Sequence, residues 1–329
     1  MNEMQSTKYK ILKILYEQNK LVSSKLLSEE LGISRSAVWK AVKALNSDGY
    51  DIQSAQSSGY ELKAVPKTLS EYALRLYLAE ELEDILINIP EKTGSTNADV
   101  MNVFEEKNSP QKILIATNHQ TAGRGRYGRD FLSVGEGLYF TYGEKYSSSC
   151  KICDLITVNI AVAVCETIKT FLNIDTDIKW VNDILSYGKK IAGILTQAKY
   201  DLENKAVGCS AVGVGINIAG SAGGFPAEIR NRAGALYDKH MPEFDYNKFL
   251  AGIINNYVKL SLEKPEKIID LYKSRCVLLN KKIKFAKDGK TVFAEAVDID
   301  NNGHLMVRLN DGRLSALMSE EVEMVREDN

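Results

Sequence analysis

Apolar residues recur with three different spacings along the chain, and these spacings constrain the fold more than any other feature does. Near the amino terminus they follow the 3.6-residue period of helices. Between about residues 70 and 265, strand-like runs alternate with helical ones, as in α/β or α+β domains. After about residue 275, short alternating runs are separated by Asp-Gly or Asn-Gly turns, which is typical of a small β domain. The spacings therefore predict an α+β multidomain protein with three domains, at residues 1–65, 66–274 and 275–329.

The charge is unevenly distributed along the chain. Lys and Arg together number 42 and Asp and Glu 43, so the net charge of −1 excludes a protein that is basic throughout. Residues 1–47, however, hold eight basic and four acidic side chains, an excess of four positive charges. Such an excess is typical of a segment that contacts nucleic acid.

Cysteine and histidine usage excludes a disulfide scaffold and gives no metal motif. The five cysteines are odd in number and scattered, and no second pair at zinc spacing follows Cys150 and Cys153. The histidines, His119, His240 and His304, are also scattered. We therefore expect no metal site built from protein ligands.

Neither a secretory leader nor a membrane segment is indicated. The first residues lack the apolar core of a signal peptide. The longest uncharged run, 206–227, is long enough for a membrane span, but it contains six glycines, so a strand followed by a glycine-rich loop fits better. We expect a cytoplasmic protein that does not contact a membrane.

The first domain has the pattern of a winged helix-turn-helix. A short helix after Ser23 ends at Gly32, Ser34 can cap a third helix with an apolar stripe, and two strand-like stretches follow as a wing. This arrangement places the third helix in the major groove of DNA. The residues expected to contact DNA are Arg35, Ser36, Trp39, Lys40, Lys43 and Ser58. The alternative is that Lys40 and Lys43 only form a solvated face.

A loop of glycines and arginines, Gly123–Arg129, stands out in the central domain. It matches G-x-G-x-x-G, but no long helix follows, so a dinucleotide-binding fold is not indicated. Its glycines let the backbone approach a ligand, and its guanidinium groups suit carboxylate or phosphate oxygens. The loop therefore predicts a site for an anionic ligand, which would order it. The alternative is a flexible Arg-Gly segment that contacts RNA.

Two further constellations can serve the same ligand. Lys179–Asp183 ends a strand with polar groups beside a large aromatic side chain, and Lys190 precedes an apolar strand from which it can reach a phosphate or carboxylate. Gly94–Asn97 opens a helix, where hydroxyls and free N–H groups can bind a small polar group. Each has a plainer alternative: Lys190 as a solvated strand-edge lysine, and Ser95 or Thr96 as a helix cap.

Taken together and in this order, these motifs resemble those of the biotin protein ligases. With the N-terminal domain, the resemblance covers nearly the whole chain and extends to the bifunctional biotin operon repressor–biotin ligase class. The motifs that carry it are Gly94–Asn97, Gln120–Arg129, Lys179–Asp183, Lys190–Leu195 and Gly213–Asn217. The resemblance implies a class II synthetase-like α/β catalytic domain with a mixed sheet, followed by a C-terminal SH3-like β-barrel.

The resemblance also implies roles for individual residues. Biotin and nucleotide contacts would come from Ser95, Thr96, Asn97, Gln120, Gly123, Arg124, Gly125, Arg126, Phe131, Asn182, Lys190 and Asn217. Among these, Arg124 and Lys190 would bind the biotin carboxylate or the phosphate, and Arg126 would retain the adenylate. The expected catalytic residues are Arg126, Lys190 and Asp183, with Asp183 orienting or deprotonating the acceptor amine.

Three positions depart from the family pattern. Tyr127 and Phe131 stand where the best-known relative has Arg and Trp, and Glu320 stands where Gly is usual. We expect Tyr127 to leave the chemistry unchanged because Arg126 is retained. Phe131 still offers an aromatic face to adenine, whereas Glu320 leaves the geometry of its turn undefined by the pattern.

The implied activity has two steps. In the first, biotin and ATP, with Mg²⁺ carried by the phosphates, would form biotinyl-5′-AMP. In the second, the biotin would be accepted by a lysine of biotin carboxyl carrier protein, which belongs to acetyl-CoA carboxylase or another biotin-dependent carboxylase. The adenylate would also be a corepressor that favours a homodimer on operator DNA. Two alternatives are a non-catalytic metabolite-sensing repressor and a lipoate ligase-like enzyme. Retention of Arg126 and Lys190 argues against the first, and Ser95–Asn97 with Gln120 favours biotin over lipoate.

Overall fold

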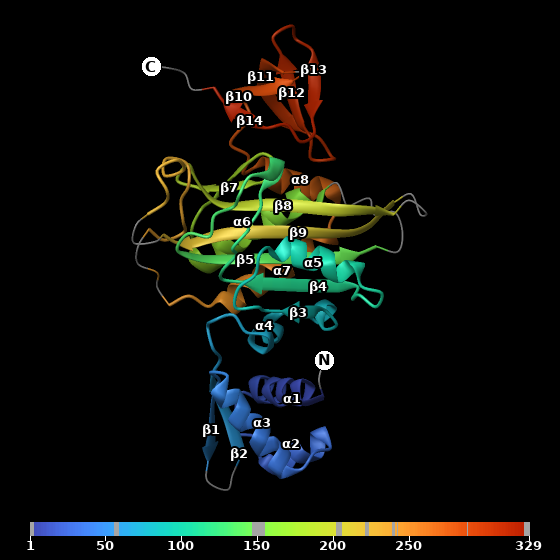
Figure 1. Ribbon diagram of the computed structural model, residues 1–329, viewed down its shortest axis with the longest axis vertical. Coiled ribbons are helices and arrows are strands. Elements are labelled where there is room, and N and C mark those ends of the chain that lie inside the picture. Colours follow the sequence, from blue (N-terminus) through green and yellow to red (C-terminus); the bar gives the residue numbers. More distant parts are fainter. Residues whose placement is uncertain are drawn as a thin grey trace. The chain divides into compact units, whose positions relative to one another are not determined.

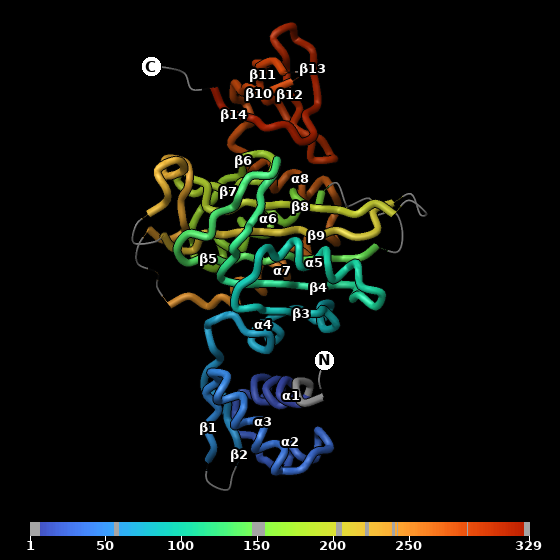
Figure 2. The backbone as a smooth tube through the Cα atoms, in the orientation of Figure 1, coloured from blue at the N-terminus to red at the C-terminus, as the bar shows by residue number. Residues whose placement is uncertain are grey.

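The computed structural model describes residues 3–55, 59–146, 155–201, 206–220, 224–238, 241, 243–287 and 289–325. The chain divides into two compact units, Met1–Ala79 with Phe244–Ala251, and Glu80–Glu243 with Gly252–Asn329. Figure 1 shows their helices and strands coloured along the sequence, and Figure 2 traces the backbone alone. Within the described ranges, no helix has the length and apolar content needed to cross a membrane.

The first unit contains the predicted winged helix-turn-helix. Its elements are α1 (Glu3–Gln18), α2 (Ser24–Leu31), α3 (Arg35–Ser47) and the antiparallel strands β1 (Asp51–Ala55) and β2 (Gly59–Ala64). The predicted helix caps are present. The hydroxyls of Ser23 and Ser34 accept hydrogen bonds from the N–H groups of Leu26 and Ala37, and Gly32 adopts φ 64°. The apolar stripe of α3 is buried in one cluster with apolar residues of α1 and α2.

One close backbone contact fixes the wing to the helices. Val22, between α1 and α2, exchanges two backbone hydrogen bonds of 2.8 Å with Tyr60 of β2. At Gly59, φ is +140° and a Cβ would lie 2.1 Å from the Val22 carbonyl oxygen, so only glycine fits. Ser58, expected to contact DNA from the wing, lies outside the described residues.

A short helix and a returning segment complete the first unit. The helix α4 (Glu71–Tyr77) is not among the elements expected from the sequence. The buried side chain of Asn247 accepts a hydrogen bond from Ser70 N (2.9 Å) and donates to the carbonyl oxygens of Pro66 and Thr68. The segment after the wing is therefore held by three hydrogen bonds to the Asn247 side chain.

A seven-stranded mixed sheet forms the centre of the second unit. Its strands are β3 (Leu86–Asn88), β4 (Lys112–Thr117), β5 (Glu136–Lys145), β6 (Asp177–Lys179), β7 (Asp183–Ser186), β8 (Lys189–Asp201) and β9 (Ala206–Ala219), in the order β3-β4-β5-β9-β8-β7-β6. The β3–β4 pair is parallel and the other neighbouring pairs are antiparallel. The mixed sheet expected for the central domain is therefore confirmed.

Helices cover both faces of this sheet. On one face, α5 (Thr96–Glu105) contacts β4, β5 and β9, and a Cβ on Gly213 of β9 would lie 1.7 Å from the side-chain oxygen of Asn97 in α5. On the other face, Thr196 of β8 lies 2.7 Å from the hydroxyl of Thr157 in α6 (Ile156–Leu172). The helices α7 (Tyr246–Ser261) and α8 (Pro265–Lys273) follow, and α8 packs on α6. On the first face, α5 can lie this close to the sheet only because Gly213 has no side chain to meet Asn97.

The end of the chain forms a five-stranded antiparallel sheet. Its strands are β10 (Lys281–Lys287), β11 (Lys290–Ile299), β12 (Leu305–Leu309), β13 (Leu314–Leu317) and β14 (Val322–Met324), in the order β13-β12-β11-β10-β14. The turn glycines Gly289, Gly303 and Gly312 adopt φ values of 73°, 83° and 83°, as hairpin turns require. The C-terminal β domain is confirmed, but β13 and β14 are its outer strands, and no ladder between described residues closes a barrel.

Candidate active site and DNA-binding surface

The aromatic ring of Phe131 lies on a floor made by two glycines of adjacent strands. Gly193 of β8 and Gly215 of β9 are direct partners in the antiparallel ladder, and we call this pair the glycine floor. A Cβ on Gly193 would lie 2.9 Å from the ring atom Cε2, and one on Gly215 would lie 2.7 Å from Cε1. Tyr139 of β5 meets the ring edge-on, with 6.2 Å between ring centroids. A side chain at either glycine would therefore displace the ring.

The glycine-arginine loop folds back on itself beside this floor. From here on the name covers residues 123–131, because Asp130 and Phe131 complete the folded segment. The N–H of Phe131 donates to the Gly123 carbonyl (2.8 Å) and the N–H of Gly125 donates to the Arg129 carbonyl (2.7 Å). A Cβ on Gly123 would lie 2.6 Å from the Phe131 oxygen, so this crossing needs glycine. Tyr127, at the tip, adopts a left-handed φ of 58°. The loop thus has a hairpin-like form whose base is closed by backbone hydrogen bonds.

Lys190 and Asp183 form an ion pair at the edge of the glycine floor. The Lys190 Nζ lies 2.5 Å from the Asp183 Oδ1, and their side chains are 36% and 24% exposed. The same ammonium lies 5.9 Å from the centroid of the Phe131 ring. The two charged groups expected in the chemistry are therefore brought together beside the loop. An anionic ligand at Lys190 would have to share the ammonium with Asp183.

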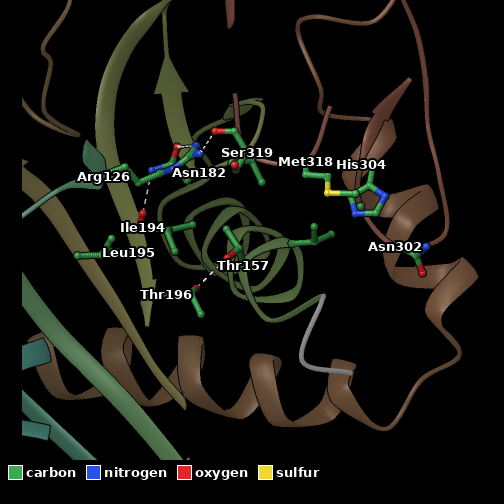
Figure 3. A pocket seen from close by; sticks show the side chains of 13 residues that line it. Arg126, Thr157, Asn182, Ile194, Leu195, Thr196, Asn302, His304, Met318 and Ser319 are labelled. Carbon is green, nitrogen blue, oxygen red and sulfur yellow. Dashed lines mark hydrogen bonds between the residues drawn. The ribbon is translucent and has the colours of Figure 1, made fainter. Parts of the chain in front are cut away.

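Arg126 reaches from the loop to a cavity of about 280 Å³. Its Nη1 donates to Asn182 Oδ1 at 3.4 Å and its Nη2 donates to the carbonyl oxygen of Ser319. Asn182 in turn donates to the Ile194 carbonyl at 2.8 Å. Figure 3 shows Arg126, Asn182 and Ser319 together on one side of the cavity, with Thr157, Thr196 and His304 on other sides. Arg124 is exposed, and its backbone is paired with Asp130.

A chain of hydroxyl and amide groups ties the start of α5 to the sheet. Thr96 donates from its N and Oγ1 to the side-chain oxygen of Gln120, at 2.8 and 3.1 Å. The Thr141 hydroxyl lies 2.8 Å from Thr96 Oγ1 and 2.7 Å from Asn97 Oδ1, and the Asn97 amide donates to a β8 carbonyl. Ser95 is the N-cap residue, but its side chain makes no capping hydrogen bond. Ser95 thus occupies the cap position of the helix-cap alternative without the capping hydrogen bond, and the Thr96 N–H and hydroxyl donate to Gln120 instead.

Asn217 of β9 carries a buried acceptor that lacks a donor. The residue is 6% exposed and its amide donates to the Gly234 carbonyl at 2.9 Å. Its Oδ1 has no hydrogen-bond partner among the residues that the structure describes. Leaving a buried acceptor unsatisfied costs about 1–3 kcal/mol. A donor group of a bound ligand would remove that cost, which fits the expected place of Asn217 beside a nucleotide.

The histidines, cysteines and acidic residues in the described part of the chain were compared with the needs of a metal site and of a thiol nucleophile. In the described part of the chain, no group of three or more His, Cys, Asp or Glu side chains is placed to hold a metal ion. Burial raises the pKa of the Cys165 thiol to about 11, which makes it a poor nucleophile. Cys150, Cys153 and His240 lie outside the described residues.

In the first unit, α3 presents one exposed face. Five of the six residues expected to contact DNA lie on it: Arg35, Ser36, Trp39, Lys40 and Lys43. Trp39 is 53% exposed, and the Lys43 Nζ lies 5.2 Å from the centroid of its ring. Val38 and Leu45, on the other face of the helix, are fully buried. An exposed aromatic with cations on the helix after a tight turn suits a nucleic-acid surface.

Several side chains that hold the site were missed by the sequence analysis. Thr141 is a fully buried hydroxyl in the apolar strand β5, and a polar residue in such a run was a readable signal. Arg129 donates to the carboxylate of Glu321, and Arg126 donates to the Ser319 carbonyl. The Arg129–Glu321 contact joins residues 192 positions apart, so no local pattern indicates it.

Comparison with known proteins identifies the class that this fold and site define. Three family models match: an HTH domain over residues 7–61, the biotin/lipoate A/B protein ligase family over 90–217, and the biotin protein ligase C terminal domain over 278–325. The solved biotin protein ligase from Aquifex aeolicus, in complex with biotin and ATP, is similar with a TM-score of 0.59 and 21% identity, over 73% of this chain and 99% of that chain. The fold is therefore that of a biotin ligase-like catalytic domain, with a helix-turn-helix before it and a β domain after it.

The sequences of curated relatives narrow this class. The chain is 31% identical to the bifunctional ligase/repressor BirA of Bacillus subtilis, over 98% of this chain and 100% of that protein. It is 24% identical to the biotin--[acetyl-CoA-carboxylase] ligase of Mycobacterium tuberculosis, over 73% of this chain and 89% of that protein. The chain belongs to the biotin protein ligase family, in its bifunctional ligase/repressor form.

Proposed function

We propose that this protein is an ATP-dependent biotin protein ligase that also represses transcription of biotin genes, with biotinyl-5′-AMP as both intermediate and corepressor. The ligase activity is supported by one observation above all: Arg126, Asn182, Lys190 and Asp183 lie together at the glycine-arginine loop. The similarity to a bifunctional ligase/repressor over almost the full length supports both halves.

In the first step, the biotin carboxylate attacks the α-phosphorus of ATP, an acyl phosphate anhydride forms and pyrophosphate leaves. A carboxylate with an ordinary pKa is ionised at neutral pH, so this step needs no general base. Its obstacle is the repulsion between two anions. Lys190, Arg124 and Arg126 are the cations suited to lowering this repulsion and aligning the reactants. Mg²⁺ would arrive bound to the phosphates of ATP.

Other residues of the site would bind without taking part in bond changes. Ser95, Thr96 and Gln120 would contact the ureido head of biotin, while Asn97 holds the start of α5 against the sheet. Gly123 and Gly125 allow the loop backbone to close, Asn182 and Asn217 would contact the nucleotide, and Phe131 would offer a ring face to it. The unsatisfied Asn217 oxygen supports this assignment, because a nucleotide supplies N–H and O–H donors.

In the second step, the amine of a lysine on biotin carboxyl carrier protein attacks the carbonyl carbon of the anhydride, an amide forms and AMP leaves. The amine must be neutral to attack. Asp183, beside Lys190, is the candidate to orient the amine and accept its proton. We expect Asp183→Asn to slow transfer from preformed biotinyl-5′-AMP by roughly 10²-fold. Transfer at the wild-type rate, measured by single-turnover quenching, would remove this role from Asp183.

Pyrophosphate release separates the proposed function from its alternatives. The purified chain should release pyrophosphate from ATP when biotin is added and should not respond to lipoate, because the α5 start and Gln120 offer polar partners for a ureido group. A lipoate ligase-like enzyme would respond to lipoate instead. A metabolite-sensing repressor without catalysis would bind biotin but release no pyrophosphate.

The DNA-binding half would use Arg35, Ser36, Trp39, Lys40 and Lys43 of α3 in the major groove, and Ser58 would be a further DNA contact. The adenylate would favour a homodimer, which brings two such domains to an operator with two half-sites. The same proposal includes a cytoplasmic location, a class II synthetase-like central domain, an SH3-like relationship for the open last sheet, and the division into residues 1–65, 66–274 and 275–329.

A further inference from the structure

The turn between β13 and β14, residues 318–321, lies against the glycine-arginine loop. The guanidinium of Arg126 and the hydroxyl of Tyr127 both donate to the carbonyl oxygen of Ser319. Arg129 donates from Nη1 to Glu321 Oε1 at 2.8 Å and from Nη2 to the other oxygen of the same carboxylate. Three neighbouring side chains of the loop therefore form hydrogen bonds to one turn of the C-terminal β domain. One of these contacts, between Arg129 and Glu321, is a bidentate ion pair.

Glu320 shapes the turn that receives these contacts. Its carboxylate accepts hydrogen bonds from the N–H groups of Met318 (2.8 Å) and Ser319 (3.0 Å). A glycine at position 320, as the family pattern has, could not make these bonds. The departure at Glu320 is therefore accompanied by a local cap that fixes the backbone whose Ser319 carbonyl meets the loop.

The charges around Glu321 favour its ionised form. The hydrogen bond from Arg129 lowers the pKa of the Glu321 carboxyl, and attraction by Arg129, Lys179 and Arg126 adds to the effect against the opposing influence of burial. The same bond raises the pKa of Arg129. Both side chains are about half exposed, and an exposed ion pair alone contributes little to the stability of a fold. We therefore expect the Arg129–Glu321 ion pair to affect the position of the loop more than the global stability of the protein.

The two ends of the loop are held differently. At its base, Phe131 is seated on the glycine floor and its N–H is bonded to Gly123. At its tip, the side-chain hydrogen bonds to other described parts of the unit run to the 318–321 turn and, at 3.4 Å, from Arg126 to Asn182. Loss of the turn contacts would leave the base in place and release the arginine-bearing tip.

We propose that the 318–321 turn positions the tip of the glycine-arginine loop, with Arg129 and Glu321 as the positioning ion pair, so that the C-terminal β domain sets how long the adenylate stays bound. The second part of this inference rests on the proposed function. Arg129 and Glu321 act through Arg126: they hold the loop so that the Arg126 guanidinium stays beside Asn182 and the cavity.

Charge reversal of the full-length protein tests the positioning pair. Arg129→Glu and Glu321→Arg each replace the ion pair by two like charges, whereas the double variant restores opposite charges in exchanged places. The first readout is the rate of tryptic cleavage after Arg126 in the ligand-free protein, followed by mass spectrometry. The second is the release rate of preformed biotinyl-5′-AMP. We expect each single variant to raise both rates about fivefold, and the double variant to return them to within about twofold of wild type.

The Arg308–Glu295 ion pair in the same β domain provides a matched control. Its side chains are 52% and 46% exposed, against 59% and 47% for Arg129 and Glu321. Arg308→Glu should change neither readout, and the melting temperatures of all variants should agree closely. A double variant that is cleaved as fast as the single variants, or an equal acceleration by Arg308→Glu, overturns the inference.

The cleavage readout needs no substrate, so the two proposals fail separately. If the wild-type chain forms no biotinyl-5′-AMP, the proposed function fails, while tryptic cleavage still decides whether the turn holds the loop. If the adenylate forms and the double variant does not restore its retention, the inference about the turn fails alone.

Discussion

Replacing Lys190 by glutamine should lower biotin-dependent pyrophosphate release by roughly 10²- to 10³-fold. The ammonium of Lys190 is a cation at the edge of the glycine floor, and it is already held at 2.5 Å by Asp183. The reaction must bring a carboxylate up to a phosphate, and removing this charge leaves their repulsion less compensated. The substitution keeps a polar side chain of similar length, so the loss measured in a steady-state pyrophosphate assay reports the charge.

The adjacent lysine is the matched control for this substitution. Lys189 begins the same strand and is exposed, whereas Lys190 lies beside the Phe131 ring. Lys189→Gln should therefore retain pyrophosphate release within about twofold, since an exposed charge is well screened by solvent. A loss of less than tenfold in Lys190→Gln, or an equal loss in both variants, would show that Lys190 does not provide the charge compensation.

Replacing Arg126 by glycine should accelerate loss of biotinyl-5′-AMP from the protein by roughly 10- to 100-fold, because a hydrogen bond to a charged group contributes about 1.5–3 kcal/mol. Arg126 lines the cavity and is the arginine of the loop that touches Asn182. The adenylate is a reactive anhydride, so its escape should appear as biotin on lysines of bystander proteins. The release rate can be measured by chasing labelled adenylate with an excess of unlabelled compound.

The variant Arg126→Lys tests whether the positive charge of Arg126 or its planar guanidinium retains the adenylate. Lysine retains the positive charge but cannot reach Asn182 and the Ser319 carbonyl with one planar group. We expect its release rate to lie between those of the wild type and Arg126→Gly. Unchanged release in Arg126→Gly would exclude Arg126 as the residue that retains the adenylate.

Local patterns allowed the helices of the winged helix-turn-helix and the strands of the C-terminal β domain to be predicted, whereas α4 was not. The caps Ser23 and Ser34, the turn at Gly32 and the stripe of α3 each act within a few residues, so periodicity and capping chemistry suffice to find them. The same holds for the C-terminal hairpins, whose turns require glycine at positive φ. The helix α8 had a readable signal too, because Pro265 stands at its start and Ile268, Ile269 and Tyr272 form its buried face.

The candidate site could be predicted as a set of residues but not as an arrangement. The motifs contained Gly193 and Gly215, and Phe131 was an expected nucleotide contact. That these three residues meet depends on the register of β8 against β9, which pairs the two glycines. The Lys190–Asp183 pair likewise depends on how β7 and β8 fold together. Contacts between the loop and the 318–321 turn join distant parts of the chain, and Glu320 departs from the family pattern, so its capping role could be found only in the folded structure.

Covalent modification of a carrier lysine tests the central claim most directly. Purified biotin carboxyl carrier protein should be incubated with this protein, ATP, Mg²⁺ and biotin, and its intact mass measured over time. We predict a gain of one biotinyl group on a single lysine, dependent on both ATP and biotin, and no gain with lipoate in place of biotin. A carrier whose mass stays unchanged while the wild-type protein is shown to be folded, or a carrier that gains a lipoyl group instead, would contradict the account.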